Sequence, residues 1–214
     1  MNQLATVRSL QERIAEMQPL RLDESGLPTA PQLRPLLPGG ALRKGAPTAV
    51  HGSLQLALAL LLGVSSSGAW CGAIGLPELG AEAVAQLGLA LDRFVLVPDP
   101  GRHALSVTGM LSEVLTAVVL CPTQRPAAGE IERLGARLRD HGTALVVVGD
   151  WPRSDTALHV TGSRWSGLGA GHGLLEMQEL AVRSVDRRGG RTHTVRFHEG
   201  RLAPAAAPFE RSRS

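Results

Sequence analysis

The 214-residue chain contains no tyrosine, and only 3% of its residues are aromatic. This scarcity argues against a stacking platform for single-stranded nucleic acid, because such a platform places aromatic side chains beneath the bases. The hydrophobic core must instead be built from Leu, Val, Ala and Ile. The hydrophobic fraction of 43% is typical of a globular chain, and the length suffices for one well-packed domain with tails.

Cysteine is almost absent as well. Cys71 and Cys121 are too few for a disulfide framework or a metal quartet, and both lie in apolar segments, so we predict buried, reduced thiols. The longest apolar run, residues 54–62, is interrupted by Gln55 and is too short to cross a bilayer. The N-terminus lacks the pattern of a signal peptide. We therefore expect a soluble, cytoplasmic protein with no membrane partner.

Lysine occurs once, at Lys44, and the remaining basic residues other than histidine are arginines. The net charge of +3 is unevenly distributed. From Arg183 onward there are 8 Arg and 3 acidic residues, a net charge of +5, which leaves −2 for the rest of the chain. A basic C-terminal part indicates either an acidic partner such as DNA or a solvated sheet edge and tail, and composition leaves both open.

The chain divides into four segments. Residues 1–18 are predicted to form an amphipathic helix, because apolar side chains recur every three or four positions between Leu4 and Met17. This helix either supports self-association and partner binding or packs on its own domain. Residues 19–47 are rich in Pro and Gly and are predicted to be a linker on the domain surface. Residues 199–214 are predicted to be a disordered tail.

The main domain, residues 48–198, alternates between short apolar runs and amphipathic segments. Strands are predicted at residues 48–51, 69–74, 94–97, 114–120 and 143–148, and helices at residues 53–62, 78–87, 104–113 and 127–141. Continuously apolar strands separated by helices predict an α/β fold with a mostly parallel sheet flanked by helices. Later strands, predicted at residues 157–161, 174–185 and 192–198, are joined by glycine-rich turns and indicate antiparallel pairing at the C-terminal edge.

The order of these elements resembles that of the RecA-fold ATPases. The strand at residues 48–51, followed by Gly52-Ser53 at the start of a helix, is similar to the entry of a RecA phosphate loop. Residues 70–74 and 87–100 are similar to later RecA segments. A closer similarity is to the ImuA-like branch of actinobacteria, the small RecA-related partners of ImuB. It is carried by the stretches GLPELG at 75–80, ALDR at 90–93 and WSGLGAGHG at 165–173.

The resemblance implies a RecA-like core and a role in the SOS response to DNA damage. It implies an accessory factor that binds an ImuB-like protein and acts with an error-prone C-family DNA polymerase in mutagenic translesion synthesis. We therefore expect a non-catalytic scaffold. Two alternatives stay open: a cell-division inhibitor of the SulA type, which has a shortened RecA-like fold without a phosphate loop, and a divergent RecA-like ATPase.

The residues needed for phosphate chemistry are missing. A working phosphate loop needs a lysine that reaches the β- and γ-phosphates and a Ser or Thr that holds Mg²⁺. Gly52 and Ser53 form only a degenerate loop, and Lys44 precedes the strand that it would have to follow. The strand at 114–120 is followed by Cys121 instead of a metal-binding Asp. We therefore predict no enzyme activity, no cofactor and no metal site. Weak nucleotide binding at the helix start remains an alternative.

A glycine-rich stretch at residues 162–173 is the most distinctive loop of the chain. Such a backbone adapts or turns tightly, since glycine adopts conformations closed to other residues. The stretch either contacts DNA or a protein partner, or forms a hairpin connection with its tryptophan packed into the core. The candidate contact residues are Arg164, Trp165 and His172.

A second candidate surface surrounds the predicted Gly-Gly turn. Arg187, Arg188 and Arg191 flank this turn and can project to solvent together. They are predicted either to contact DNA phosphates or to protect an exposed sheet edge against aggregation.

Overall fold

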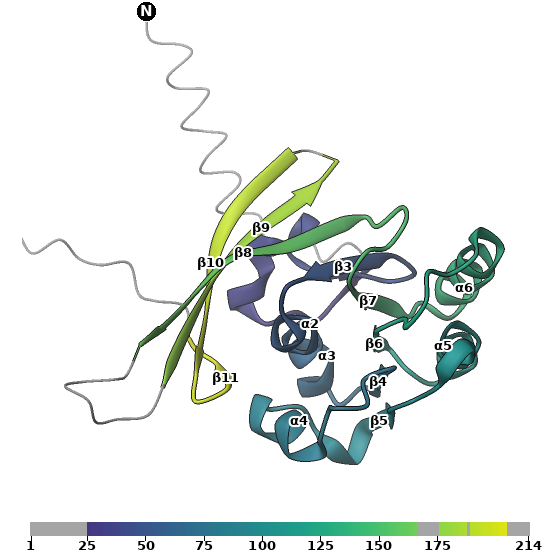
Figure 1. The fold of residues 1–214 in the computed structure, drawn as a ribbon, viewed down its shortest axis with the longest axis horizontal. Coiled ribbons are helices and arrows are strands. Elements are labelled where there is room, and N and C mark those ends of the chain that lie inside the picture. Colours follow the sequence, from purple (N-terminus) through teal and green to yellow (C-terminus); the bar gives the residue numbers. More distant parts are fainter. Residues whose placement is uncertain (1–24, 167–175, 188, 205–214) are drawn as a thin grey trace, which may run out of the picture.

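The computed structural model describes residues 25–166, 176–187 and 189–204 (Figure 1). Within these residues, nine strands form one sheet in the order β11-β10-β9-β8-β3-β7-β6-β4-β5. Neighbours from β5 to β8 pair in parallel, and neighbours from β8 to β11 pair antiparallel. The strands are β3 (Pro47–His51), β4 (Cys71–Ile74), β5 (Phe94–Val97), β6 (Ala117–Leu120), β7 (Ala144–Val148), β8 (Thr156–Ser166), β9 (Met177–Asp186), β10 (Gly189–His198) and β11 (Arg201–Leu202).

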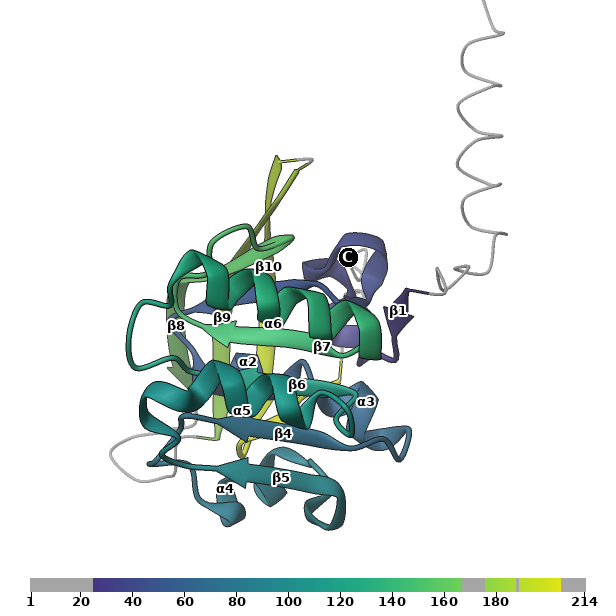
Figure 2. The ribbon, with the colours of Figure 1, turned by 90° about the vertical axis from the view of Figure 1, so that its right-hand side faces the viewer.

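Helices cover both faces of the parallel part of the sheet. In Figure 2, α5 and α6 lie in front of the strands and α2, α3 and α4 lie behind them. The α-helices are α2 (Leu54–Ala59), α3 (Leu62–Ser66), α4 (Ala81–Leu87), α5 (Ala104–Leu111) and α6 (Ala128–His141), with short 3-10 turns η3 (Leu91–Arg93) and η4 (Gly101–His103). The prediction of an α/β fold with a mostly parallel, helix-flanked sheet and antiparallel strands at its edge is confirmed. None of the helices in the described part is both long and apolar enough to span a bilayer.

Each central strand contributes to two cores because successive side chains point to opposite faces. In β3, Val50 packs into the cluster under α2, α3 and α4, whereas Ala49 packs into the cluster under α5 and α6. Helix α6 buries Leu134 and Leu138 in the second cluster. Burial on both faces explains why the parallel strands are continuously apolar in the sequence.

The segment before β3 is part of the folded domain. It forms β1 (Gly26–Leu27), η1 (Pro31–Leu36), η2 (Pro38–Gly40) and β2 (Leu42–Arg43). Leu33 and Leu36 are fully buried in the larger core cluster, and the Ser184 hydroxyl of β9 donates to the Leu36 carbonyl oxygen at 2.7 Å. The prediction of a surface linker over 19–47 is therefore wrong for residues 25–47. Leu33 and Leu36 lie in the 3-10 turn η1, where Pro31 and Pro35 give the sequence the composition of a linker. The helix predicted over 1–18 lies outside the described residues.

The first residues of the predicted tail are also ordered. After a turn at Gly200, β11 pairs with the end of β10, with Phe197 opposite Leu202. The side chains of Gln55 and Gln86 donate to the carbonyl oxygens of Gly200 and Glu199 at 3.1 and 3.2 Å. These contacts correct the prediction for residues 199–204, and residues 205–214 lie outside the described part.

Smaller differences concern the ends of elements. The helix predicted over 53–62 is divided into α2 and α3, and the helix predicted from residue 78 begins only at Ala81. Gly80 adopts an extended conformation ahead of α4, which leaves Glu78 in an exposed turn. The strand predicted over 157–161 continues as β8 to Ser166.

Candidate functional site

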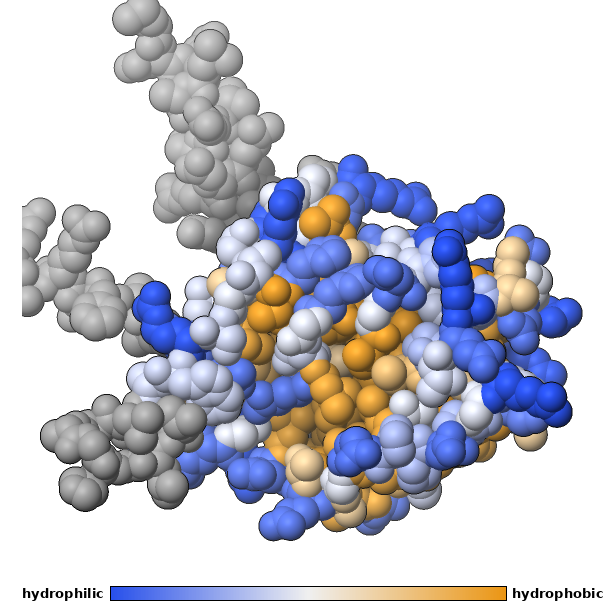
Figure 3. Space-filling view, in the orientation of Figure 1, coloured by the Kyte–Doolittle hydropathy of each residue, from blue (hydrophilic) through white to orange (hydrophobic). Residues whose placement is uncertain are grey.

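The parallel strands end together at one side of the sheet, which we call the carboxyl edge. The strand arrows point to the left in Figure 2, so Figures 1 and 3 look onto this edge. The chain passes from β3 to α2 on one face and from β6 to α6 on the other. In open α/β sheets, ligands bind beyond the carboxyl ends of the strands. The site lies where the chain leaves one strand towards one face of the sheet and leaves a nearby strand towards the other face. A ligand site is therefore expected at the carboxyl edge.

Gly52 and Ser53 form the connection between β3 and α2 at this edge. The Ser53 hydroxyl oxygen accepts from the Leu56 backbone N–H at 3.0 Å and so caps the helix. Gly52 has a positive φ of 86°, and a Cβ atom placed on it would lie 3.2 Å from Val160 Cβ of β8. The connection is a two-residue turn, and Val160 of the neighbouring strand β8 packs directly against its glycine. It is too short to wrap around a phosphate group.

A cavity of about 740 Å³ lies beside this turn, between the ends of β3 and β8 and the loops that follow β6 and β7. His51 and His159 line it as the last paired residues of β3 and β8, where they stand in register. Loop side chains supply further polar groups, among them Thr123, Gln124 and Arg125 after β6 and Asp150 after β7. Trp151, nine-tenths buried, forms part of the wall.

The two imidazoles are stacked, with ring centroids 4.3 Å apart and planes 7° from parallel. His51 Nδ1 lies 3.7 Å from a carboxylate oxygen of Asp150. Burial lowers the pKa of His159, and the nearby positive charges of His51 and Arg183 lower it further, against an opposing effect of Asp150. Repulsion between two charged, stacked imidazoles therefore acts on His159 in the same direction as its burial.

The His pair was not among the residues singled out from the sequence. Only the parallel pairing of β3 with β8 brings it together, and sequence spacing gives no signal of that register. Within the described residues, no group of three or more His, Cys, Asp or Glu side chains is arranged to hold a metal ion. The cavity offers hydrogen-bonding side chains and a single arginine, but no lysine.

Arg164 and Trp165 lie near the end of β8, beyond the last residue of β3. Arg164 stands opposite Glu179 and Trp165 opposite Gln178 of β9. Trp165 is 50% exposed, so the alternative in which it packs into the core is wrong. His172 lies outside the described residues. The antiparallel pair of β8 and β9, which we call the hairpin, therefore projects a large exposed aromatic side chain past the carboxyl edge.

Arg187 directly follows β9, and Arg191 lies near the start of β10. Both are therefore near the end of the hairpin that is opposite Trp165. An Arg187 guanidinium nitrogen is 3.9 Å from a carboxylate oxygen of Asp155, and Arg191 stands opposite Ser184. Arg188 lies outside the described residues. Because β9 contains 10 residues, the two ends of the hairpin are about 30 Å apart. The structure thus does not bring the two sets of candidate contact residues together.

The cysteines differ in their environment. Both are free thiols; Cys71 is buried in β4, and burial raises its pKa to about 12. Cys121, directly after β6, is only partly buried, and burial raises its pKa as well. The prediction of buried thiols is confirmed for Cys71 and is too strong for Cys121. Neither environment favours the reactive thiolate.

Comparison with known proteins shows which family this chain belongs to. A family model described as the MT3502 N-terminal domain matches residues 35–153, which include all parallel strands except β8. An uncharacterized protein of Mycobacterium tuberculosis strain H37Rv, Rv3395c, is 31% identical over 127 residues. The match covers 58% of this chain and 62% of the relative, so the chain spans less than two thirds of that relative's length. Because the family model covers more than half of the chain, the chain belongs to the family of the MT3502 N-terminal domain.

Proposed function

We propose that this chain is a cytoplasmic, non-catalytic accessory protein of the DNA-damage response. In this proposal its core is RecA-like but cannot hydrolyse ATP. It binds an ImuB-like protein and links it to an error-prone C-family polymerase during mutagenic translesion synthesis. The proposal starts from the resemblance in the sequence, and the geometry of the carboxyl edge supports it.

One observation carries the non-catalytic part of the proposal. In this proposal the turn at Gly52-Ser53 corresponds to a phosphate loop, yet its hydroxyl caps α2 and its glycine lies against Val160. Phosphoryl transfer depends on cations and metal ions placed around the transferred group. The sequence places no lysine and no arginine between Lys44 and Arg93, so this turn has no cation of its own to offer.

The topology also supports a RecA-like core. β3 is the first strand of the large sheet in chain order and lies in its middle, the strands after it lie to one side, and the later antiparallel strands extend the other. The similar protein from Mycobacterium tuberculosis comes from an actinobacterium, the group in which the ImuA-like branch occurs.

The surface of the carboxyl edge suits a protein partner. Apolar residues gather in the middle of this face and hydrophilic residues surround them (Figure 3). Leu54 of α2 and Val160 of β8 are only half-buried there, on either side of Gly52. Trp165 on the projecting hairpin adds an exposed aromatic side chain of the kind that dominates binding energy at interfaces.

Co-purification with a tagged ImuB-like protein tests the proposal. We expect the wild-type chain to be retained and the Trp165→Ala chain to bind at least about tenfold more weakly, as is typical of an interface hot spot. Trp70→Ala is a matched control, since Trp70 is 41% exposed but precedes β4 at the opposite edge. Failure of the wild-type chain to bind contradicts the proposed function. Unchanged binding by Trp165→Ala contradicts only the placement of the interface.

A further inference from the structure

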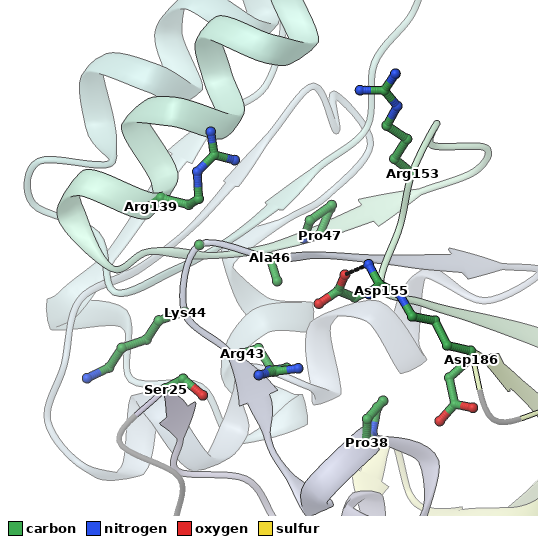
Figure 4. Close-up of a pocket in the computed structure, with 12 residues that line it drawn as sticks. Ser25, Pro38, Arg43, Lys44, Ala46, Pro47, Arg139, Arg153, Asp155 and Asp186 are labelled. Carbon is green, nitrogen blue, oxygen red and sulfur yellow. Dashed lines mark ion pairs between the residues drawn. The ribbon is translucent and has the colours of Figure 1, made fainter.

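A second cavity, of about 590 Å³, lies at the amino ends of β3 and β8, on the side of the sheet opposite the carboxyl edge (Figure 4). Ser25, ahead of β1, and Pro38 of η2 form part of its lining. The rest comes from four segments far apart in the sequence: β2 with the β2–β3 connection, the end of α6, the β7–β8 loop, and the end of β9 with the β9–β10 turn. Each segment brings at least one cationic side chain. We call this cavity the amino-edge pocket.

A glycine allows two of these segments to meet. Gly45 has a φ of +68°, and a Cβ atom placed on it would lie 2.8 Å from the Arg139 Cα atom at the end of α6. Its backbone N–H donates to the Thr143 carbonyl oxygen at 3.0 Å, and the Lys44 N–H donates to the Ser25 carbonyl oxygen at 2.8 Å. This close approach places Lys44, the single lysine of the chain, on the same pocket wall as Arg139.

The lining of the pocket is strongly basic. In the described part of the chain, five cationic side chains line it together with two carboxylates, Asp155 and Asp186. The cations are Arg43, Lys44, Arg139, Arg153 and Arg187. The net charge of the lining is therefore +3.

Two ion pairs at the pocket are long, and their arginine side chains are exposed. Arg187 lies 3.9 Å from Asp155, and Arg153 lies 4.0 Å from Glu132 outside the lining. Exposed pairs of this kind are worth little, and a phosphate group can replace them at low cost. The Ser25 hydroxyl oxygen is buried at the pocket and has no hydrogen-bond partner among the described residues.

We propose that the amino-edge pocket binds phosphodiester groups of a nucleic acid strand. A site for one small metabolite needs a few buried, precisely placed polar groups, whereas all five cations here are exposed. Exposed arginines and a lysine from several segments suit a backbone of repeated phosphates, which is recognised by charge and without regard to sequence. Among the described residues that line the pocket none is aromatic, so the proposed contacts are to phosphate and not to stacked bases.

This inference goes beyond the proposed function, which requires a protein partner only. It also gives Arg187 a specific position: among the predicted DNA-contacting arginines, Arg187 reaches this pocket together with four cations from elsewhere in the chain. Arg164 is on the other end of the hairpin and takes no part.

Fluorescence anisotropy of the purified full-length chain with a fluorescein-labelled, mixed-sequence single strand tests the inference over a series of salt concentrations. Each phosphate contact to a single strand contributes about −0.7 to the slope of log K against log salt. The double variant Lys44→Gln/Arg139→Gln should therefore flatten the slope by about 1.4 and weaken binding at low salt. Arg133→Gln is the matched control, because Arg133 is exposed on the same helix but does not line this pocket.

The outcomes are distinct. The inference is supported if the double variant binds more weakly and has a flatter slope of log K against log salt, while Arg133→Gln binds like the wild type. Unchanged melting temperatures must show that both variants are folded. A loss in Arg133→Gln of about half that in the double variant, in proportion to the one charge removed against two, indicates only a general effect of charge and overturns the inference. Unchanged binding by the double variant overturns it as well. If inorganic pyrophosphate displaces the strand at equal phosphate concentration, the pocket is a small-anion site and the inference is wrong. No protein partner is present, so none of these results bears on the ImuB-like partner.

Discussion

Leu33 offers a sharp test of whether the segment before β3 belongs to the folded domain. Its side chain is fully buried in the larger core cluster, although it lies in a segment rich in Pro and Gly. Leu33→Ala removes about three buried carbon groups, worth about 2.4 kcal/mol at ~0.8 kcal/mol each. Incomplete collapse of the cavity adds to this loss, so we expect about 3 kcal/mol in the free energy of unfolding.

Urea unfolding followed by circular dichroism measures this loss. For a chain of this size, 3 kcal/mol corresponds to a fall in Tm of about 6–12 °C. Leu91→Ala is the control, because Leu91 is 46% exposed, and it should cost less than about 1 kcal/mol. A companion variant, Ser184→Ala, leaves the buried Leu36 carbonyl oxygen without its donor and should cost about 1–2 kcal/mol. If Leu33→Ala loses no more stability than Leu91→Ala, the segment is a surface linker after all and our description of the core is wrong.

Other features of the molecule can be tested separately: its expected lack of ATP hydrolysis, residues 1–18, His159 and the two cysteines. Purified protein should hydrolyse ATP no faster than a blank, with or without DNA, and turnover stimulated by DNA would contradict the non-catalytic proposal. Deleting residues 1–18 should preserve a cooperative melt but weaken self-association or partner binding; aggregation of the truncated chain would instead assign this segment to the core. The pKa of His159 in the folded protein lies below its unfolded value of 6.5. As the pH falls, the unfolded state therefore takes up its proton at a higher pH than the folded state, so the free energy of unfolding should fall below about pH 6.5. His159→Asn should flatten this fall, and an unchanged pH profile would show that the ring does not couple to folding. A thiol reagent at neutral pH should modify Cys121 before Cys71, since Cys71 is fully buried with a pKa raised to about 12, and equal rates would show that β4 opens readily.

Periodicity predicted the parallel half of the molecule well. The strand expected at 94–97 coincides with β5, and the helix expected over 127–141 differs from α6 by one residue. Both have strong local signals in the sequence: a four-residue apolar run that Pro98 stops, and an amphipathic pattern over residues 127–141. In the structure, Gly142 ends the helix in the left-handed conformation. Such signals depend only on neighbours in the chain, so they can be read without knowledge of the fold.

Features that depend on contacts between distant segments could not be predicted. The His51–His159 stack requires the register of β3 against β8, which are more than 100 residues apart. The amino-edge pocket combines cations from four segments, of which only Arg187 was singled out from the sequence. The burial of Leu33 depends on β9 and β10, which follow it by more than 140 residues. In each case the local sequence has no period that indicates the contact.

We propose that this chain works by binding partners in the DNA-damage response. Affinity capture of the tagged full-length chain from DNA-damaged and undamaged cells, read by quantitative mass spectrometry, tests it most directly. We predict that an ImuB-like protein and a C-family polymerase are enriched after damage, and that Trp165→Ala reduces both while Trp70→Ala does not. Enrichment of a cell-division protein in their place would support an inhibitor of the SulA type and contradict the account.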